Sequence, residues 1–168
     1  MTDLFGDNNN GAEFSDCGKY RYKLWRIWNP EMPIVQCIGL NPSTANANKN
    51  DQTINILRRN LNRLGYGGLY MTNLFAFISS NPNDLPDCED PIKDNDIKLL
   101  EVSKICNGIT IVCWGGFKQS GMADRIKEVL PMFPGALCFG KNADGTPLHP
   151  MGIMWGGIKN PTLMPYNE

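Results

Sequence analysis

Apolar segments of strand length alternate with amphipathic segments of helix length, and this alternation constrains the fold more than any other feature of the chain. The predicted strands cover residues 20–28, 34–40, 69–77, 109–116 and 136–140, and the predicted helices cover about 53–64, 95–106 and 120–129. Strands that alternate with helices are joined by right-handed crossovers into a parallel sheet. We therefore predict an α/β fold, a three-layer αβα arrangement with a mostly parallel central sheet of about four to five strands.

The length of the chain sets its domain organisation. A chain of 168 residues suits one domain with a complete hydrophobic core. Residues 1–18 are polar and rich in turn formers, so we predict a flexible or irregular N-terminal arm, followed by a single α/β domain over residues 19–168. No apolar run reaches the ~18 residues of a membrane span, and the N-terminus lacks a signal-peptide pattern. We expect a cytoplasmic protein without membrane contact.

Cysteine spacing, histidine content and charge argue against two classes of site. None of the six cysteines is arranged as C-x-x-C, and His149 is the single histidine, so we expect no metal site and no cofactor. The net charge is -1 and the sequence pI is about 5.8, with the basic residues scattered along the chain. A large basic surface for duplex nucleic acid is therefore not expected, although a local basic patch is compatible with the sequence.

The region between the third and fourth predicted strands contains a long loop and a helix. The loop, residues 79–94, carries three prolines, and a loop of this length in a compact domain is typical of a functional segment or a lid. In the helix that follows, Ile97, Leu100 and Ile105 are predicted to form the buried stripe.

Three of the predicted strands end in polar or glycine residues. Residues 39–42 end the second strand, Asn73 is a polar residue within the third, and residues 114–116 end the fourth. Because the carboxyl ends of parallel strands meet at one edge of the sheet, we expect these residues to share a ligand site. The turn at residues 149–150 follows the last strand and is expected to fold over the same edge.

The residue types at this edge suit a planar heterocyclic base. An amide side chain such as that of Asn41 or Asn73 offers one acceptor and two donors in a plane, which matches the edge of a nucleobase. An aromatic ring such as the Trp114 indole can stack on the face of the base. The sequence therefore predicts a nucleobase or nucleotide pocket.

Each of these residues also has a structural explanation. Asn41 precedes a proline and is a common turn former, and Asp51 is most simply a helix N-cap. Asn73 could be satisfied by partners within the sheet, Trp114 could belong to the core, and His149 could lie on the surface. These alternatives stay open at the level of sequence.

The chain resembles the family catalogued as domain of unknown function 1643. The matching segments are residues 39–45, Asp51 with Thr53, residues 65–68 leading into 73–76, Trp114 with Gly115, and residues 147–150. They occur in the same order and extend the resemblance over about residues 20–151. The family implies no activity.

A broader likeness connects the chain with the uracil-DNA glycosylase superfamily. In that superfamily a Gly-x-Asn-Pro loop, a base-reading Asn and a late His-Pro turn form the site, and here these correspond to residues 39–42, Asn73 and residues 149–150. The likeness implies a uracil-DNA-glycosylase-like fold. The chain departs from the superfamily pattern at Ser43 after the proline and at residues 151–152, where a Ser-Pro wedge for DNA is absent.

Three functions remain open. The first is hydrolysis of the N-glycosidic bond of a base, modified or not, in DNA or in a nucleotide. The second is nucleotide binding or sequestration without catalysis. The third is chemistry on a phosphorylated small molecule held by the loop at residues 43–44. The partner would be a nucleobase, a nucleotide, or a single-stranded or flipped DNA base, and the oligomeric state is left open.

Candidate residues follow from the likeness and from the edge of the sheet. The candidate catalytic residues are Asn41, which would orient a water molecule, Asp51, which would activate it, and His149, which would donate a hydrogen bond to a base oxygen. The candidate substrate-binding residues are Gly39, Leu40, Pro42, Ser43, Thr44, Thr53, Asn73, Phe75, Trp114, Gly115 and Pro150.

Overall fold

The computed structural model describes residues 9–46, 48–81, 90, 92, 94–118 and 121–167. The strands are β1 (Asn10–Phe14), β2 (Arg21–Ile27), β3 (Ile34–Gly39), β4 (Gly68–Asn73), β5 (Thr110–Val112), β6 (Leu137–Cys138) and β7 (Met164–Pro165). The helices are α1 (Gln52–Arg63), α2 (Asn95–Ile105), α3 (Met122–Val129) and α4 (Pro150–Trp155), with the 3-10 helix η2 (Leu130–Met132). The predicted α/β class is confirmed.

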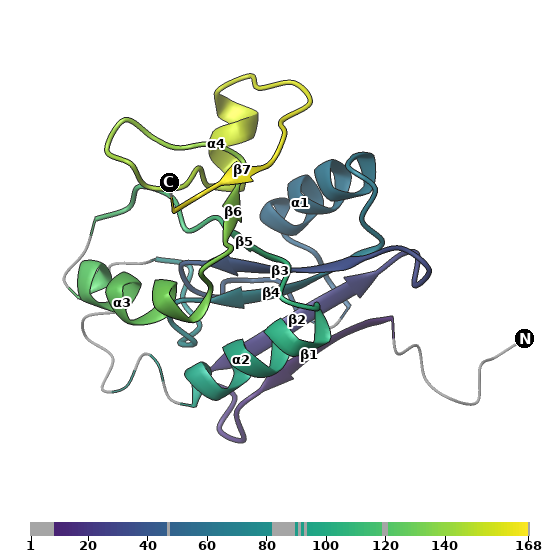
Figure 1. The fold of residues 1–168 in the computed structure, drawn as a ribbon. Helices are drawn as coiled ribbons and strands as arrows, with labels where there is room; N and C mark the ends of the chain where they lie inside the picture. The colour runs from purple at the N-terminus through teal and green to yellow at the C-terminus, as the bar shows by residue number, and fades with distance from the viewer. Residues whose placement is uncertain are drawn as a thin grey trace, which may run out of the picture.

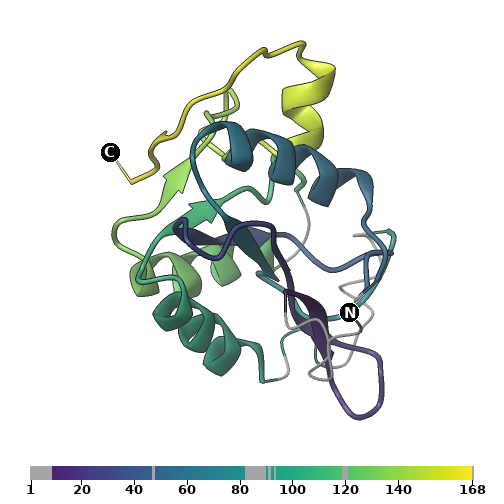
Figure 2. The same ribbon diagram turned by 90° about the vertical axis from the view of Figure 1, so that its right-hand side faces the viewer.

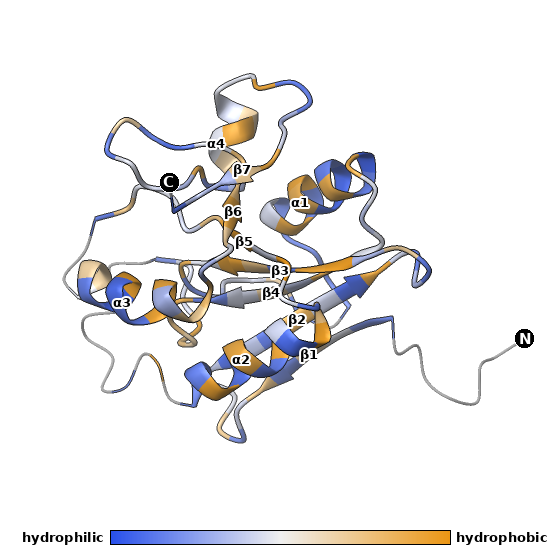
Figure 3. Ribbon diagram, viewed as in Figure 1, coloured by the Kyte–Doolittle hydropathy of each residue, from blue (hydrophilic) through white to orange (hydrophobic). Residues whose placement is uncertain are grey.

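Helices cover both faces of the sheet. Helices α1 and α4 lie on one side, and α2 and α3 lie on the other (Figures 1 and 2). Successive residues of β3 divide between the two hydrophobic cores: Val35 and Cys37 pack with α1 and α4, whereas Ile38 packs with α2 and α3. Strand β3 is therefore buried on both faces, and it forms the centre of three layers. Figure 3 shows that much of this strand is hydrophobic.

The sheet is larger and more mixed than the sequence predicts. Among the described residues it has seven strands, in the order β1-β2-β4-β3-β5-β6-β7. The pairs β3–β4, β3–β5 and β5–β6 are parallel, whereas β1–β2, β2–β4 and β6–β7 are antiparallel. The prediction of four to five mostly parallel strands describes only the centre of the sheet. The two edge strands escaped prediction because β7 is short and exposed and β1 is mostly exposed or half-buried, so neither has a clear alternating pattern.

Strand β1 falls within the segment 1–18 for which the sequence predicts an arm. Residues 1–8 of that segment lie outside the described residues. Most of the long loop predicted between β4 and α2, residues 82–89, 91 and 93, also lies outside them, as do residues 119–120 at the predicted start of the third helix. Among the described residues, no helix has the length and apolar character needed to cross a membrane.

Helix α1 forms as its sequence predicts. Asp51 is the N-cap, and its Oδ1 accepts a hydrogen bond from the backbone amide of Ile54 at 2.9 Å. Ile54, Leu57 and Leu61 recur at helical spacing and are buried against the sheet. The chain leaves the helix at Gly65, whose φ of 90° requires a residue without a side chain. The cap fixes the Asp51 side chain at the start of α1.

Helix α2 presents a different face to the sheet from the one predicted. The predicted stripe was Ile97, Leu100 and Ile105, and all three are exposed. The buried residues are Asn95, Leu99 and Val102. Both sets have helical spacing, so periodicity alone does not choose between them. Asn95 turns inward because its Nδ2 donates to the backbone carbonyl oxygens of Asn73 and Leu74, which fixes the rotation of the helix.

Candidate functional site

The carboxyl ends of β3 and β4, with the segments that follow β3 and β5, border a cavity of about 490 Å³. This volume lies in the ordinary range for small-molecule sites. The structure brings together ten of the predicted site residues in the cavity wall: Gly39, Leu40, Asn41, Ser43, Asp51, Thr53, Asn73, Trp114, Gly115 and His149. The cavity is therefore the candidate functional site.

Four predicted ligand contacts do not line the cavity. Phe75 is buried in the core formed with α2 and α3, and Pro150 is the buried first residue of α4. Thr44 is exposed to solvent. Pro42 is buried, and its carbonyl oxygen accepts hydrogen bonds from Asn41 and Ser79.

Asn41 holds the loop that borders the cavity. Its Nδ2 donates to the carbonyl oxygens of Pro42 at 3.0 Å and Ser79 at 2.8 Å. An amide nitrogen has only two hydrogens to donate, so both are used within the protein. Asn41 can therefore act on a ligand or a water molecule only as an acceptor, through its Oδ1.

Asp51 connects the loop to helix α1. Its Oδ2 accepts a hydrogen bond from the Ser43 hydroxyl at 3.2 Å, while Oδ1 caps the helix. A carboxylate has about four lone-pair positions, so with these two hydrogen bonds it can still accept a hydrogen bond from another donor. The bonds also fix the direction of the carboxylate at the cavity wall.

Asn73 is the last residue of β4 and lies deep in the cavity wall. Only 2% of it is exposed, and its Nδ2 has no hydrogen-bond partner. A Cβ added at Gly39 on the neighbouring strand would lie 2.8 Å from the Asn73 Oδ1, so the side chain occupies space that only a glycine leaves open. A buried amide without a partner is costly, which indicates a role other than stability.

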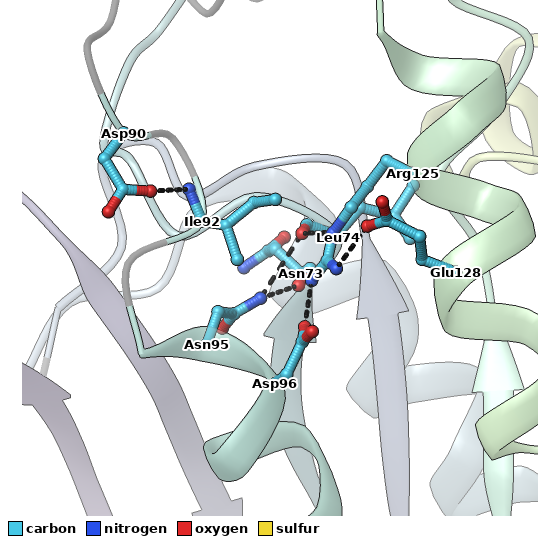
Figure 4. Close-up of polar contacts among 8 residues, drawn as sticks. All are labelled: Asn73, Leu74, Asp90, Ile92, Asn95, Asp96, Arg125 and Glu128. Carbon is cyan, nitrogen blue, oxygen red and sulfur yellow. Dashed lines mark hydrogen bonds and ion pairs between the residues drawn. The ribbon is translucent and has the colours of Figure 1, made fainter.

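The backbone behind Asn73 is held by a buried polar cluster (Figure 4). Asn95 donates to the Asn73 carbonyl oxygen at 2.7 Å, and the Nε of Arg125 donates to the Leu74 carbonyl oxygen at 2.8 Å. The guanidinium of Arg125, itself buried, forms an ion pair with Asp96 at 2.5 Å. These bonds anchor the end of β4 from the side of α2 and α3, so the Asn73 amide is presented from a fixed backbone.

Trp114 is both a core residue and a wall of the cavity. Its indole is 1% exposed and meets the Tyr166 ring edge to face at a centroid distance of 5.8 Å. Its Nε1 donor has no partner in the structure. Gly115 follows with a φ of 81° and passes so close to His149 that an added Cβ would lie 3.0 Å from the His149 Cβ.

His149 caps helix α4 through its ring. The Nδ1 accepts a hydrogen bond from the backbone amide of Met151 at 3.0 Å. Burial lowers the pKa of His149 below its ordinary value of 6.5, against the attraction of Asp51, which raises it. A neutral ring whose Nδ1 accepts must carry its proton on Nε2. His149 therefore offers the cavity a neutral N–H donor.

Arg21 is a cavity residue that the sequence did not indicate as functional. It lies in the predicted strand at residues 20–28 and is not among the candidate site residues, yet it is 3% exposed and lies in the cavity wall. Its Nη1 donates to the Ala45 carbonyl oxygen at 2.6 Å, and its Nε has no partner. Burial lowers the pKa of its guanidinium to about 10, opposed by the attraction of Asp51, so the group keeps its charge at neutral pH.

Gly116, expected at this edge as part of residues 114–116, also lines the wall. The wall residues that sequence analysis missed are Ile54, Met71, Ser79, Ser80, Phe117 and Trp155. Two of them are exposed aromatic residues. Trp155 at the end of α4 is 76% exposed, and Phe117 follows the glycines after β5. An exposed apolar ring beside a cavity would have indicated these two residues, but the sequence does not show which rings are exposed.

In the part of the chain that the structure describes, no group of three or more His, Cys, Asp or Glu side chains could hold a metal ion. Burial raises the pKa of the Cys113 thiol to about 12 and that of Cys37 well above its ordinary value. Both thiols stay protonated and unreactive at neutral pH.

The chain belongs to the family described as protein of unknown function (DUF1643), whose family model matches residues 21–151. The family expected from the sequence is thereby confirmed. No curated protein and no solved structure matches the chain.

Proposed function

We propose that the cavity of this DUF1643 protein binds a nucleobase and that the protein hydrolyses the N-glycosidic bond of that base, modified or not, in DNA or in a nucleotide. The observation that carries the proposal is the unpartnered amide nitrogen of Asn73, buried in the cavity wall. It is accompanied by the neutral donor of His149 and the carboxylate of Asp51 in the same wall.

Recognition of a base follows from the donors. Asn73 Nδ2 and Trp114 Nε1 are buried N–H groups without partners, and both residues line the cavity. Donors of this kind favour a ligand that presents acceptors at fixed positions, because such a ligand removes the cost of leaving them unpaired. The carbonyl oxygens and ring nitrogens at the edge of a base meet this requirement.

Cleavage would use the two titratable groups that flank the base. Water attacks the anomeric carbon of the sugar, the bond from that carbon to the base nitrogen breaks, and the electron pair leaves with the base. Asp51 accepts a proton from the attacking water, and this proton returns to the base through solvent. The Nε2–H of His149 stabilises the negative charge that develops on a base oxygen. Asn41 can orient the water only through Oδ1, because both of its N–H groups are bound.

The likeness to the uracil-DNA glycosylase superfamily supports this assignment. It covers the loop at residues 39–42, Asn73 and His149, and all three parts border the cavity. We propose a uracil-DNA-glycosylase-like arrangement of the parallel centre of the sheet. The likeness of fold alone does not establish an activity, so the assignment depends on the chemistry of the site.

A second candidate is a nucleotide-binding protein without catalytic activity. The observation that favours it is that Asp51 and Asn41 both hold the loop through hydrogen bonds. These structural roles account for the presence of Asp51 and Asn41 at the cavity without any catalytic role. The two candidates share the pocket and differ only in whether base is released.

Base release separates the two candidates. The protein is incubated with single-stranded and duplex DNA carrying natural or deaminated bases, and with the matching nucleosides and nucleotides, and free base is measured by chromatography. Catalysis predicts multiple turnovers of release that fall at least a hundredfold in Asp51→Asn and in His149→Gln. Saturable binding without release identifies the non-catalytic binder. A protein that neither binds these ligands nor releases base would contradict both candidates.

Asp124→Asn is the matched control for Asp51→Asn. It removes a carboxylate from the exposed face of α3, where the structure gives Asp124 no part in the cavity. Its release rate should equal that of the wild type. An equal loss in both variants would mean that the effect of Asp51→Asn comes from net charge.

A further inference from the structure

Arg21 places a buried positive charge in the cavity wall without a matching negative partner. All six ion pairs found among the described residues involve other groups, and none brings a carboxylate within 4.0 Å of Arg21. Asp51 attracts it through space, but the hydrogen bonds of its two oxygens are made with Ser43 and Ile54. Buried charges in proteins are normally paired, because desolvation of an isolated charge is expensive.

The contacts of Arg21 account for only part of its guanidinium. Its Nη1 donates to the Ala45 carbonyl oxygen, whereas its Nε is buried without a partner. Arg26 on the same strand differs in two ways: its Nε has a hydrogen-bond partner, and its side chain lies outside the cavity wall. It braces the same loop with Nε on Asn50 at 2.7 Å and Nη2 on the Asn46 carbonyl oxygen at 2.5 Å, and it does not line the cavity. Bracing the loop therefore does not require a side chain in the cavity wall.

The position of Arg21 along the edge of the sheet matches the dimensions of a nucleotide. Arg21 begins β2, which lies beside β4, whereas Trp114 follows β5 on the other side of β3. Strands β2 and β5 are three strand spacings apart, or about 14 Å. A base held near Asn73 and Trp114 would leave its sugar and phosphate directed toward β2.

We propose that Arg21 binds a phosphate group of the ligand, so that the cavity selects nucleoside phosphates over nucleosides and free bases. This inference rests on the proposed function, since it assumes a base in the same cavity. A guanidinium is suited to the task because it donates several N–H groups in a plane to phosphate oxygens. The phosphate belongs either to a free nucleotide or to the backbone of a nucleic acid strand.

Calorimetric titration tests this with ligands that differ only in phosphate. Uridine, thymidine, cytidine, adenosine and guanosine are compared with their 5′-monophosphates and with short single-stranded oligonucleotides of the same bases. We expect the monophosphate of the preferred base to bind wild-type protein at least tenfold more tightly than the nucleoside. Tight binding of the oligonucleotide alone assigns the phosphate to a strand, and tight binding of the monophosphate assigns it to a free nucleotide.

Arg26→Gln is the matched control for Arg21→Gln. Both variants remove a buried guanidinium that braces the same loop, but only Arg21 lines the cavity. Arg21→Gln should abolish the preference for phosphate, Arg21→Lys should keep part of it, and Arg26→Gln should weaken nucleoside and nucleotide equally. Should Arg21→Gln fail to fold, the comparison of nucleosides with nucleotides on the wild-type protein still shows whether the cavity prefers a phosphate, and Arg21→Lys tests the role of the side chain.

Two outcomes overturn the inference and are distinguishable. A wild-type protein that binds nucleoside and nucleotide equally contradicts the role of Arg21 and leaves the proposed base recognition intact. A wild-type protein that binds none of these ligands contradicts base recognition and the role of Arg21 together.

Discussion

The Nδ1 of His149 accepts a hydrogen bond from the backbone amide of Met151, 3.0 Å away, and this one contact defines the chemistry that the ring can offer. It fixes the tautomer with the proton on Nε2 and ties the ring to the start of α4. His149 also lines the cavity, so the side chain that caps α4 is the one that we propose as a hydrogen-bond donor to the ligand.

The first prediction concerns the protonation of His149. Burial lowers its pKa below 6.5, so the unfolded chain binds more protons than the folded protein between the folded pKa and 6.5. Stability should therefore rise with pH across that window and lose this contribution as the pH falls below 6.5. Since the chain has a single histidine, NMR titration of the imidazole nitrogens follows the group without ambiguity. A pKa above 6.5, or a proton on Nδ1, would contradict the assignment.

A second prediction separates stability from binding at Asn73. Asn73→Leu removes the buried nitrogen that has no partner and keeps a side chain of similar size. We expect a free energy of unfolding equal to that of the wild type or higher by about 1 kcal/mol, because an unsatisfied polar group is lost. Ligand affinity should fall at least tenfold. Asn62→Leu, on the exposed face of α1, should change neither affinity nor base release.

The third prediction tests the space beside Asn73. In Gly39→Ala the new Cβ would lie 2.6 Å from the Met71 Cε and 2.8 Å from the Asn73 Oδ1. The methionine end can move, whereas the Asn73 backbone is held by Asn95, so the amide must rotate. We expect a loss of about 1–3 kcal/mol in unfolding free energy from overpacking, together with weakened binding. Gly135→Ala serves as the control, because nothing lies within 4 Å of its added Cβ.

The fourth prediction uses two glycines with the same backbone conformation. Gly115 and Gly108 have φ values of 81° and 76°, so alanine at either position costs about 1–2 kcal/mol from the left-handed conformation. Only at Gly115 does the new Cβ approach His149. Gly115→Ala should therefore shift the His149 NMR signals and reduce binding, whereas Gly108→Ala should reduce stability alone. Similar effects on His149 in both variants would show that Gly115 does not position the ring.

The sequence predicts the site through the geometry of parallel strands. Residues 34–40 and 69–77 read as buried strands, and the structure pairs them in parallel with Gly39 beside Asn73. That logic needs only local patterns and the rule that ligands bind at the carboxyl ends of strands. The turn at His149 is expected at the same edge, because it follows the last predicted strand.

What the sequence does not predict depends on contacts between distant segments. Arg21 lies in the predicted strand at residues 20–28, and its contact with the carbonyl oxygen of Ala45 forms only when folding brings that loop near. Helix α2 offers two apolar stripes, and its orientation is decided by Asn95 reaching the end of β4. Periodicity reports which face is apolar, but it does not report which polar group finds a partner.

The central claim is that Asn73 reads a nucleobase in this cavity. The most direct measurement is the calorimetric titration of nucleosides and nucleotides into wild-type protein and into folded Asn73→Leu protein. The account predicts one saturable site per chain in the wild type, selective among bases, and at least a tenfold loss of affinity in Asn73→Leu. Binding of equal strength in both proteins, or no binding of any base-containing ligand to the wild type, would contradict it.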